Sequence, residues 1–152
     1  MRLLLDTNVV LDVLLQREPH VKHSAAVMAV VESGLVTGLV GATTITTIYY
    51  LVEKALGARR ARKHVGTILS LCEVAPVTED VLREALALGF ADYEDAVLLE
   101  SARRARAQGV VTRDADGFKH ADLPVYAPEE LLTALRQRPR LSQGLSTRHR
   151  LP

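Results

Sequence analysis

The opening residues of the chain set the strongest constraint on its fold. Residues 3–5 are all leucine, and Asp, Thr and Asn follow at positions 6–8. An uninterrupted apolar run is typical of a strand buried on both faces, as in parallel sheets. The polar residues that end it favour turns and helix caps, and residues 9–14 have helical spacing. The segment therefore predicts a buried parallel strand with Asp6 at its carboxyl end, the edge where α/β sheets form ligand sites.

Apolar strands and helical segments alternate along the rest of the chain, which predicts one α/β layered domain with a mainly parallel sheet. Thr43 or Thr44 is the expected N-cap of the helix that Gly57 closes. The domain is expected over residues 1–138, and residues 139–152 are expected to form a basic, disordered tail. The further strands are expected at residues 35–40, 74–77, 110–112 and 123–126.

Composition narrows the class of protein. No apolar run approaches the about 18 residues of a membrane span, and no signal peptide is recognisable at the start. The single Cys72 excludes an internal disulfide, so a reducing cytoplasm is the expected compartment. Residues 136–152 carry five Arg and no acid, whereas the preceding residues carry 14 basic and 18 acidic residues. That acidic body argues against nucleic-acid binding by bulk charge and permits an acidic metal site.

A basic segment at residues 59–64, Arg-Arg-Ala-Arg-Lys-His, leads into an apolar helical pattern. One interpretation is the solvated face of an amphipathic helix. The other is a surface that contacts phosphates beside an active site. The sequence leaves both open.

Carboxylates at three distant positions are candidates for chemistry. Asp6 and Asp114 directly follow predicted strands or nearly so, and Asp95 lies in the first turn of a predicted helix. Oxygen ligands of this kind suit Mg²⁺, which takes one or two carboxylates and keeps several waters. Asp92 and Glu94 have a simpler explanation at the start of the same helix. Asp92 is a natural N-cap, Glu94 favours the positive helix end, and Asp95 is also placed as a capping-box acid.

Other acids near these positions have structural explanations of their own. Asp12 is interpreted as a solvated helix residue or a salt-bridge partner, and Asp116 beside Gly117 as turn chemistry or an additional site acid. Asp6 is the hardest to explain structurally, because a carboxylate beside a buried strand is costly unless something positive binds it.

Three short segments, taken in order, resemble the PIN-domain nucleases, which include the VapC toxins of bacterial toxin–antitoxin pairs. They are residues 4–9 (Leu-Leu-Asp-Thr-Asn-Val), 95–102 (beginning Asp-Ala) and 111–118 (Val-Thr-Arg-Asp to Phe). The resemblance runs from residue 2 to about 135 and implies a three-layer domain with a central sheet flanked by helices. It also implies an acidic cluster that binds Mg²⁺ or Mn²⁺ and cleaves RNA.

Carried over by motif, Asp6, Asp95 and Asp114 match the first, third and fourth family acids and so the metal ligands. Asn8 and Thr112 match the polar residues that orient those acids, and Asp116 falls where many members carry an additional acid or Asn.

The chain departs from the family pattern at the second acid. That acid is expected early in the helix after the second strand, where this chain has Ile48 or Tyr49. Glu53 lies one turn after Tyr49 on the same helix face. Glu53 and Asp92 are the two candidates to supply the missing charge.

The sequence therefore predicts a metal-dependent endoribonuclease that hydrolyses RNA phosphodiester bonds. The resemblance further implies the toxin of a toxin–antitoxin pair, with an antitoxin partner and a homodimer, and no membrane partner. The alternative is a PIN-like protein-binding module that has lost activity with its second acid. A zinc enzyme is not expected, because the sequence has no cluster of His and Cys with zinc-ligand spacing. An Asp6-centred phosphotransferase of the haloacid-dehalogenase type would need a second Asp where Asn8 stands.

Overall fold

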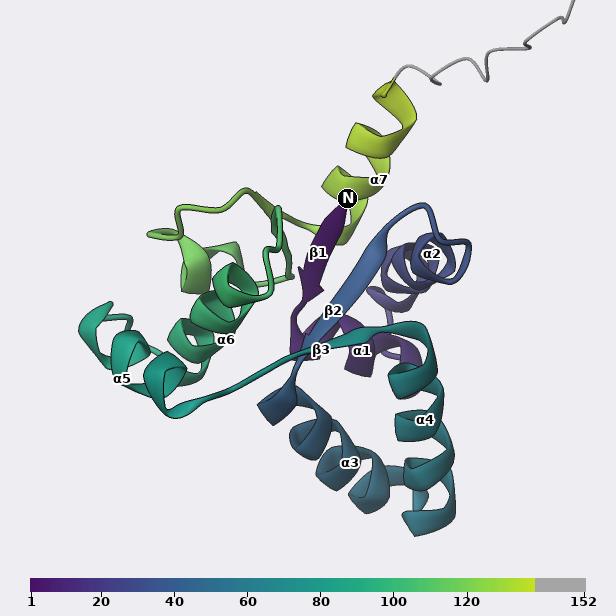
Figure 1. Ribbon diagram of the computed structural model, residues 1–152. Coiled ribbons are helices and arrows are strands. Elements are labelled where there is room, and N and C mark those ends of the chain that lie inside the picture. The colour runs from purple at the N-terminus through teal and green to yellow at the C-terminus, as the bar shows by residue number, and fades with distance from the viewer. Residues whose placement is uncertain (139–152) are drawn as a thin grey trace, which may run out of the picture.

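The computed structural model describes residues 1–138, so the expected tail at 139–152 lies outside the described residues. A five-stranded sheet forms the centre of the fold, in the order β3-β2-β1-β4-β5, and every pairing is parallel (Figure 1). The strands are β1 (Arg2–Leu5), β2 (Thr37–Gly41), β3 (Glu73–Ala75), β4 (Val110–Val111) and β5 (Val125–Tyr126). The predicted parallel α/β architecture is confirmed.

Helices cover both faces of the sheet, as the three-layer expectation requires. Because side chains alternate along a strand, Leu3 and Leu5 pack on one face of β1 and Leu4 packs on the other. All three are fully buried. The helices are α1 (Thr7–Leu14), α2 (Val21–Glu32), α3 (Ala42–Leu56), α4 (Ala58–Leu71), α5 (Glu79–Ala87), α6 (Tyr93–Arg104) and α7 (Pro128–Gln137), with a 3₁₀ helix η1 (Ala115–Phe118).

The two helical layers differ in composition. The core around Leu3 and Leu5 is completed by residues of α1, α2, α3, α4 and α7, whereas Leu4 packs against residues of α6 and η1. In Figure 1, α5 and α6 accordingly lie on the opposite side of the sheet from α1 to α4. None of the helices in the described part of the chain is both long and apolar enough to cross a membrane.

The strand order fixes where a ligand site can form. The chain builds outward from β1 through β2 to β3 and then returns to place β4 on the other side of β1. Loops that leave the carboxyl ends of β1 and β4 therefore run in opposite directions, which opens a crevice between them. The backbone N–H of Asp6 donates to Val111 O across 2.9 Å, so the two strand ends lie side by side.

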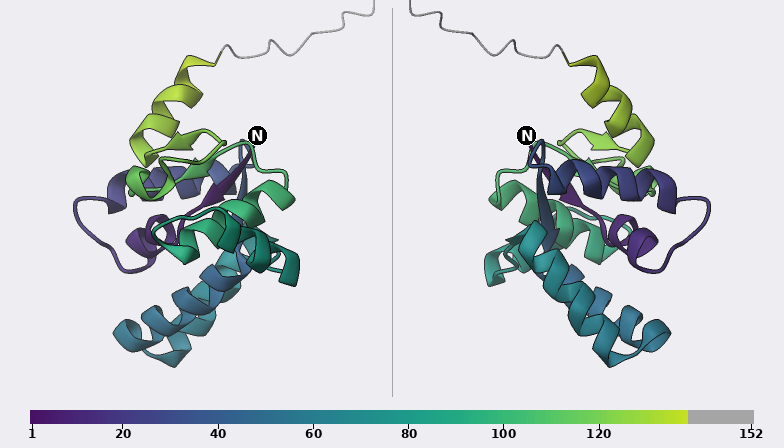
Figure 2. Two further views of the ribbon diagram at one scale, coloured as in Figure 1. Left: turned by 90° about the vertical axis from the view of Figure 1, so that its left-hand side faces the viewer. Right: turned by 90° about the vertical axis from the view of Figure 1, so that its right-hand side faces the viewer.

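The helical hairpin of α3 and α4 extends from the body of the domain (Figure 2). Gly57 joins the two helices with a φ of +90°, a conformation that favours glycine and that explains the predicted stop there. The expected threonine cap of α3 is wrong. Gly41 is the N-cap, and Thr44 is fully buried with its hydroxyl 3.1 Å from that of Thr7.

Candidate active site

Asp6 sits where β1 passes into α1, and three donors fix its carboxylate. Its Oδ1 accepts the backbone N–H of Thr7 at 2.7 Å, so Asp6 caps α1. Its Oδ2 accepts Asn8 Nδ2 at 3.0 Å and Thr112 Oγ1 at 2.7 Å. The residue is only 6% exposed. Asn8 and Thr112, the residues expected to orient the acids, thus both hold Asp6.

Thr112 connects Asp6 to Asp114. While the Thr112 hydroxyl donates to Asp6, it also accepts the backbone N–H of Asp114 at 2.9 Å. Asp114 in turn accepts the N–H of Gly117 at 3.2 Å and so caps η1. Because β1 and β4 are neighbours, two acids that lie more than a hundred residues apart in sequence are joined through one buried hydroxyl.

Asp95 approaches the same place from α6. A β-carbon built on Gly117 would lie 2.5 Å from Asp95 Oδ2 and 3.2 Å from Asp114 Oδ2. Both carboxylates therefore face one glycine, and a side chain there would displace them. Asp92 caps α6 through the N–H of Glu94 at 2.8 Å, as the cap interpretation predicts. Asp95 accepts no hydrogen bond from the described residues, so the capping-box interpretation does not apply to it.

Burial and then mutual repulsion raise the pKa values of the carboxylates gathered here. The pKa of Asp95 is raised from 3.8 to about 7, first by burial and then by the charges of Asp6, Asp92, Asp114 and Glu94. Burial also raises the pKa of Asp6, against the opposing effect of its hydrogen bonds from Thr112 and Thr7, and the charge of Asp114 raises it further. We call Asp6, Asp92, Glu94, Asp95 and Asp114 the acidic cluster.

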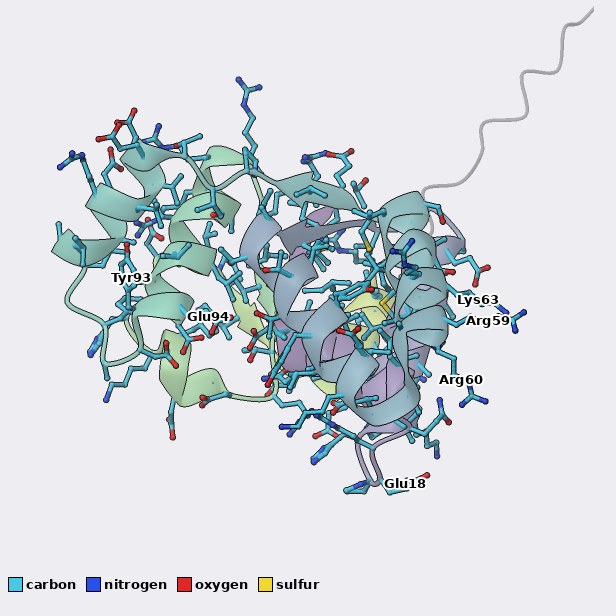
Figure 3. All side chains as sticks on the ribbon, turned by 90° about the horizontal axis from the view of Figure 1, so that it is seen from below. Glu18, Arg59, Arg60, Lys63, Tyr93 and Glu94 are labelled. Carbon is cyan, nitrogen blue, oxygen red and sulfur yellow. The ribbon has the colours of Figure 1, made fainter. Side chains whose placement is uncertain are left out.

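Glu94 is the member of the acidic cluster that the sequence predicts only as a residue of the helix end. Burial raises its pKa first, followed by the charges of Asp92 and Asp6. Figure 3, which views the molecule of Figure 1 from below, shows Glu94 turned from α6 toward the middle of the molecule and Tyr93 on the outer side. The signal in the sequence was only its position beside Asp95, which a solvated first turn explains equally well.

The position of the second family acid is apolar in this fold. Ile48 is fully buried, and Tyr49 is packed against the same core. Glu53 is exposed on α3 and does not contribute to the raised pKa of any member of the acidic cluster. Of the two candidates for the missing charge, only Asp92 affects the cluster, and Glu94 adds a second acid there.

A pocket of about 460 Å³ opens beside the cluster, between α6 and η1. Asp116 lines it together with three cluster acids, and Lys119 and His120 contribute at its rim. Its full lining is Gly89, Phe90, Ala91, Asp92, Asp95, Asp114, Asp116, Gly117, Lys119 and His120. Lys119 forms no ion pair with another described residue.

The chemistry of the cluster fits a hard divalent cation. Its donors are all carboxylate oxygens, and no ion pair formed within residues 1–138 includes any of its members. Over the same residues, no three His, Cys, Asp or Glu side chains are arranged to hold one metal ion between them. Mg²⁺ needs few direct carboxylates, because it keeps several of its waters.

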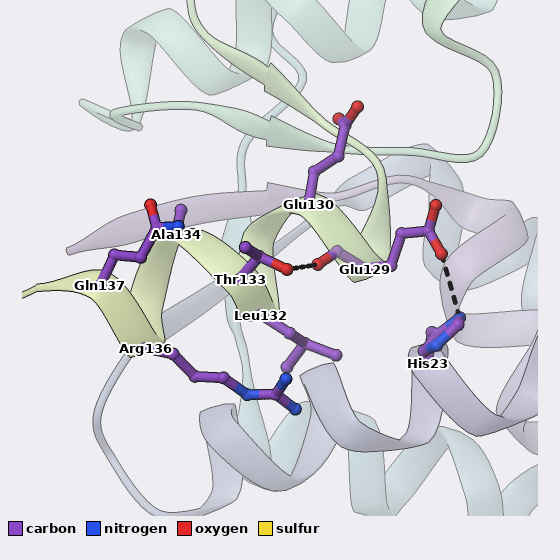
Figure 4. A pocket seen from close by; sticks show the side chains of 8 residues that line it. All are labelled: His23, Glu129, Glu130, Leu132, Thr133, Ala134, Arg136 and Gln137. Atoms are coloured by element: carbon purple, nitrogen blue, oxygen red, sulfur yellow. Dashed lines mark hydrogen bonds and ion pairs between the residues drawn. The ribbon is translucent and has the colours of Figure 1, made fainter.

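Two other surfaces lie apart from the cluster. Four basic side chains are exposed on α4 and form no ion pair with described residues: Arg59, Arg60, Arg62 and Lys63. We call them the basic α4 face, and Figure 3 shows three of them, Arg59, Arg60 and Lys63. A pocket of about 540 Å³ lies along α7 (Figure 4). It contains none of the predicted site residues, and within it His23 Nδ1 lies 3.8 Å from Glu129 Oε2.

Comparison with known proteins identifies the fold and the family. The chain is 22% identical over 134 residues to Ribonuclease VapC1 of Aquifex aeolicus, covering 85% of this chain and 92% of that protein. It superimposes on VapBC2 from Rickettsia felis, solved bound to a DNA fragment from its promoter. There the TM-score is 0.63 and the identity 17%, over 84% of this chain and 98% of that one.

A second solved relative is VapC20 of Mycobacterium tuberculosis, described as a Sarcin-Ricin loop cleaving toxin. Its TM-score is 0.64 at 15% identity, over 78% of this chain and 94% of that one. At such identities these structures establish the likeness of fold alone. The PIN domain family model matches residues 2–116, a span that contains all five members of the acidic cluster. The chain belongs to the PIN domain family.

Proposed function

We propose that this protein is a divalent-metal-dependent endoribonuclease that hydrolyses RNA phosphodiester bonds. The observation that carries the proposal is the acidic cluster, because carboxylates gather at the crevice between β1 and β4 without a paired cation from residues 1–138. Such a gathering of like charge is costly unless a cation compensates it. Membership of the PIN domain family adds independent support.

Asp6, Asp95 and Asp114 would hold Mg²⁺ or Mn²⁺, directly or through water. Glu94, whose pKa is raised by burial and by the charges of Asp92 and Asp6, would add the negative charge that the missing second acid does not supply. Asp116 stands at the pocket wall as an additional acid. A divalent cation in such a site activates the attacking water and neutralises the charge that develops on the phosphoryl oxygens.

The protein's own residues would set the geometry of the reaction. Asn8 and Thr112 fix the Asp6 carboxylate, so that it needs no reorganisation when the cation or substrate arrives. Gly117 leaves room for Asp95 and Asp114 to face the same space. Without a cation the cluster would repel an RNA phosphate, so substrate binding and metal binding are expected to be coupled.

For the cellular role, we infer the toxin of a toxin–antitoxin pair, acting in the cytoplasm as a homodimer. The support is the similarity to Ribonuclease VapC1 and to toxins of this kind. An antitoxin that inhibits such a site would cover the acidic cluster, and an Arg side chain presented to the carboxylates is the natural means.

The decisive experiment is cleavage of an internally labelled RNA with Mg²⁺, with Mn²⁺ and with EDTA. Asp6→Asn removes one charge from the cluster and is expected to lower the rate by about 10²–10³-fold, the usual cost of losing a preorganised charged group. Glu18→Gln is the matched control, because Glu18 is exposed and outside the cluster (Figure 3). Cleavage that survives both Asp6→Asn and EDTA would refute the proposal.

A protein-binding module without activity is the second candidate, and the buried Ile48 at the second-acid position favours it. Titration calorimetry with Mn²⁺ separates the two functions. A module without a metal site should give the same heats for the wild type and for Asp6→Asn. Binding that Asp6→Asn weakens supports the nuclease instead.

A further inference from the structure

Asp12 and Arg113 form an ion pair next to the acidic cluster, with the carboxylate buried and the guanidinium partly exposed. Arg113 Nε lies 2.7 Å from Asp12 Oδ2, and its second nitrogen, Nη2, lies 3.1 Å from Oδ1. Ser24 Oγ also donates to Asp12 Oδ2, at 3.1 Å. Asp12 is fully buried. The interpretation of Asp12 as a solvated residue is therefore wrong, and the salt-bridge interpretation is confirmed.

The backbone of Arg113 belongs to the candidate active site although its side chain does not. The residue stands between Thr112 and Asp114, and its N–H donates to Asn8 Oδ1 at 3.3 Å. Its side chain instead lines a separate pocket of about 240 Å³ with His20 and Ser24. The Arg113 backbone thus bonds to Asn8, which holds Asp6, whereas the Arg113 charge lies at a separate pocket.

This arrangement matters because a guanidinium is the strongest competitor for carboxylates that the chain could offer. Arg binds carboxylates through paired, charge-assisted hydrogen bonds and stays charged at every relevant pH. Glu129 is the acid that lines the same pocket as the Arg113 side chain, and it lies 3.8 Å from His23. Among the described residues, Asp12 and no other acid forms an ion pair with Arg113.

We propose that Asp12 is a positioning residue that sequesters the Arg113 charge and thereby keeps the acidic cluster open to a divalent cation. A fully buried carboxylate is stable only with a partner of this kind, so the burial of Asp12 holds the Arg113 guanidinium beside it. When a neutral residue replaces Asp12, the Arg113 side chain is free to turn to the adjacent cluster and to occupy its oxygens. The inference rests on the proposed metal site.

The test is Mn²⁺ titration calorimetry on the folded, RNA-free protein. Asp12→Asn keeps the size of the side chain and removes its charge, and it is expected to weaken Mn²⁺ binding about tenfold or more, as loss of groups that support metal ligands does. The neutral pair Asp12→Asn/Arg113→Gln has no guanidinium to release, so its Mn²⁺ affinity should return to that of the wild type. A residue with a merely structural role would not give this rescue.

Ser24→Ala is the matched control, because it removes a hydrogen bond from the same buried carboxylate and leaves the ion pair in place. It should leave Mn²⁺ affinity unchanged. Equal affinity in the wild type and in folded Asp12→Asn would overturn the inference alone. No binding by the wild type would overturn the metal site together with the inference. Should Asp12→Asn fail to fold, Asp12→Ser replaces it: a loss of Mn²⁺ affinity that added Arg113→Gln restores supports sequestration, and wild-type affinity in folded Asp12→Ser refutes it.

Discussion

Asp95→Asn should stabilise the metal-free protein, because it removes one charge from a crowded cluster. The pKa of Asp95 is raised from 3.8 to about 7 by burial and by four neighbouring acids. A shift of that size corresponds to about 4 kcal/mol of unfavourable free energy in the ionised folded state. Because the side chain is partly exposed, solvent screening reduces the expected gain to about 1–2 kcal/mol. The helix N-terminus loses about 0.3–1 kcal/mol with the charge.

The net effect should appear as a rise in Tm of a few degrees in a domain of this size. The sign follows from proton binding. Between about pH 4 and 7, folded Asp95 retains a proton that the unfolded chain has lost, so the stability of the wild type falls as the pH rises through that window. At pH 8 the full repulsion is present, and at pH 5 most of it is absent.

Thermal unfolding in EDTA, at pH 5 and at pH 8, is the appropriate assay. Asp95→Asn should exceed the wild type in Tm at pH 8 and match it at pH 5, and Glu18→Gln should match it at both. Excess Mn²⁺ at pH 8 should reverse the order, since a ligand at 100 times its Kd stabilises the protein that binds it by about 2.7 kcal/mol. A lower Tm for Asp95→Asn in EDTA at pH 8 would show that the cluster is not strained by its own charge.

Three further predictions concern the neighbours of the cluster. Gly117→Ala places a methyl group against two flexible carboxylates, so Mn²⁺ titration should show weaker binding while Tm changes little. Glu94→Gln should weaken Mn²⁺ binding and Glu53→Gln should not. The opposite result would mean that Glu53 on α3, and not Glu94, supplies the charge of the missing second acid. Neutralising the basic α4 face should flatten the dependence of RNA affinity on salt, by about one counterion for each phosphate that the protein no longer neutralises, as measured by filter binding at several salt concentrations. An unchanged slope would leave that face as solvated helix surface.

The boundaries of several helices could be predicted from the sequence, because the features that set them are local. Gly57 ends α3 through its own backbone conformation, and Pro128 begins α7 as the first-turn position predicts. The N-cap of α3 could not be predicted in this way, and the expected threonine cap was wrong. Thr44 is an excellent cap by local chemistry, yet tertiary packing places its hydroxyl against that of Thr7 and leaves the cap to Gly41.

For residues that interact with distant partners, the sequence predicted some and missed others. Asp6 was identifiable because a carboxylate after a buried apolar run is costly in any fold. Asp12 was not, because its sequence neighbours fit a solvated helix equally well and its partner lies 101 residues away. Glu94 was assigned to a helix end for the same reason. Nothing local distinguishes an acid that caps a helix from one that also faces another strand's carboxylate.

The sequence by itself determined a parallel α/β domain and the strand ends at which its chemistry gathers, since burial on both faces and turn propensity act over a few residues. Only the tertiary structure decided that β4 lies beside β1. That neighbour relation brings Thr112 to Asp6, aligns Asp114 with Asp95 across Gly117, and turns Arg113 toward Asp12. Charge–charge repulsion and ion pairing depend on distances in space, and the order of strands sets those distances.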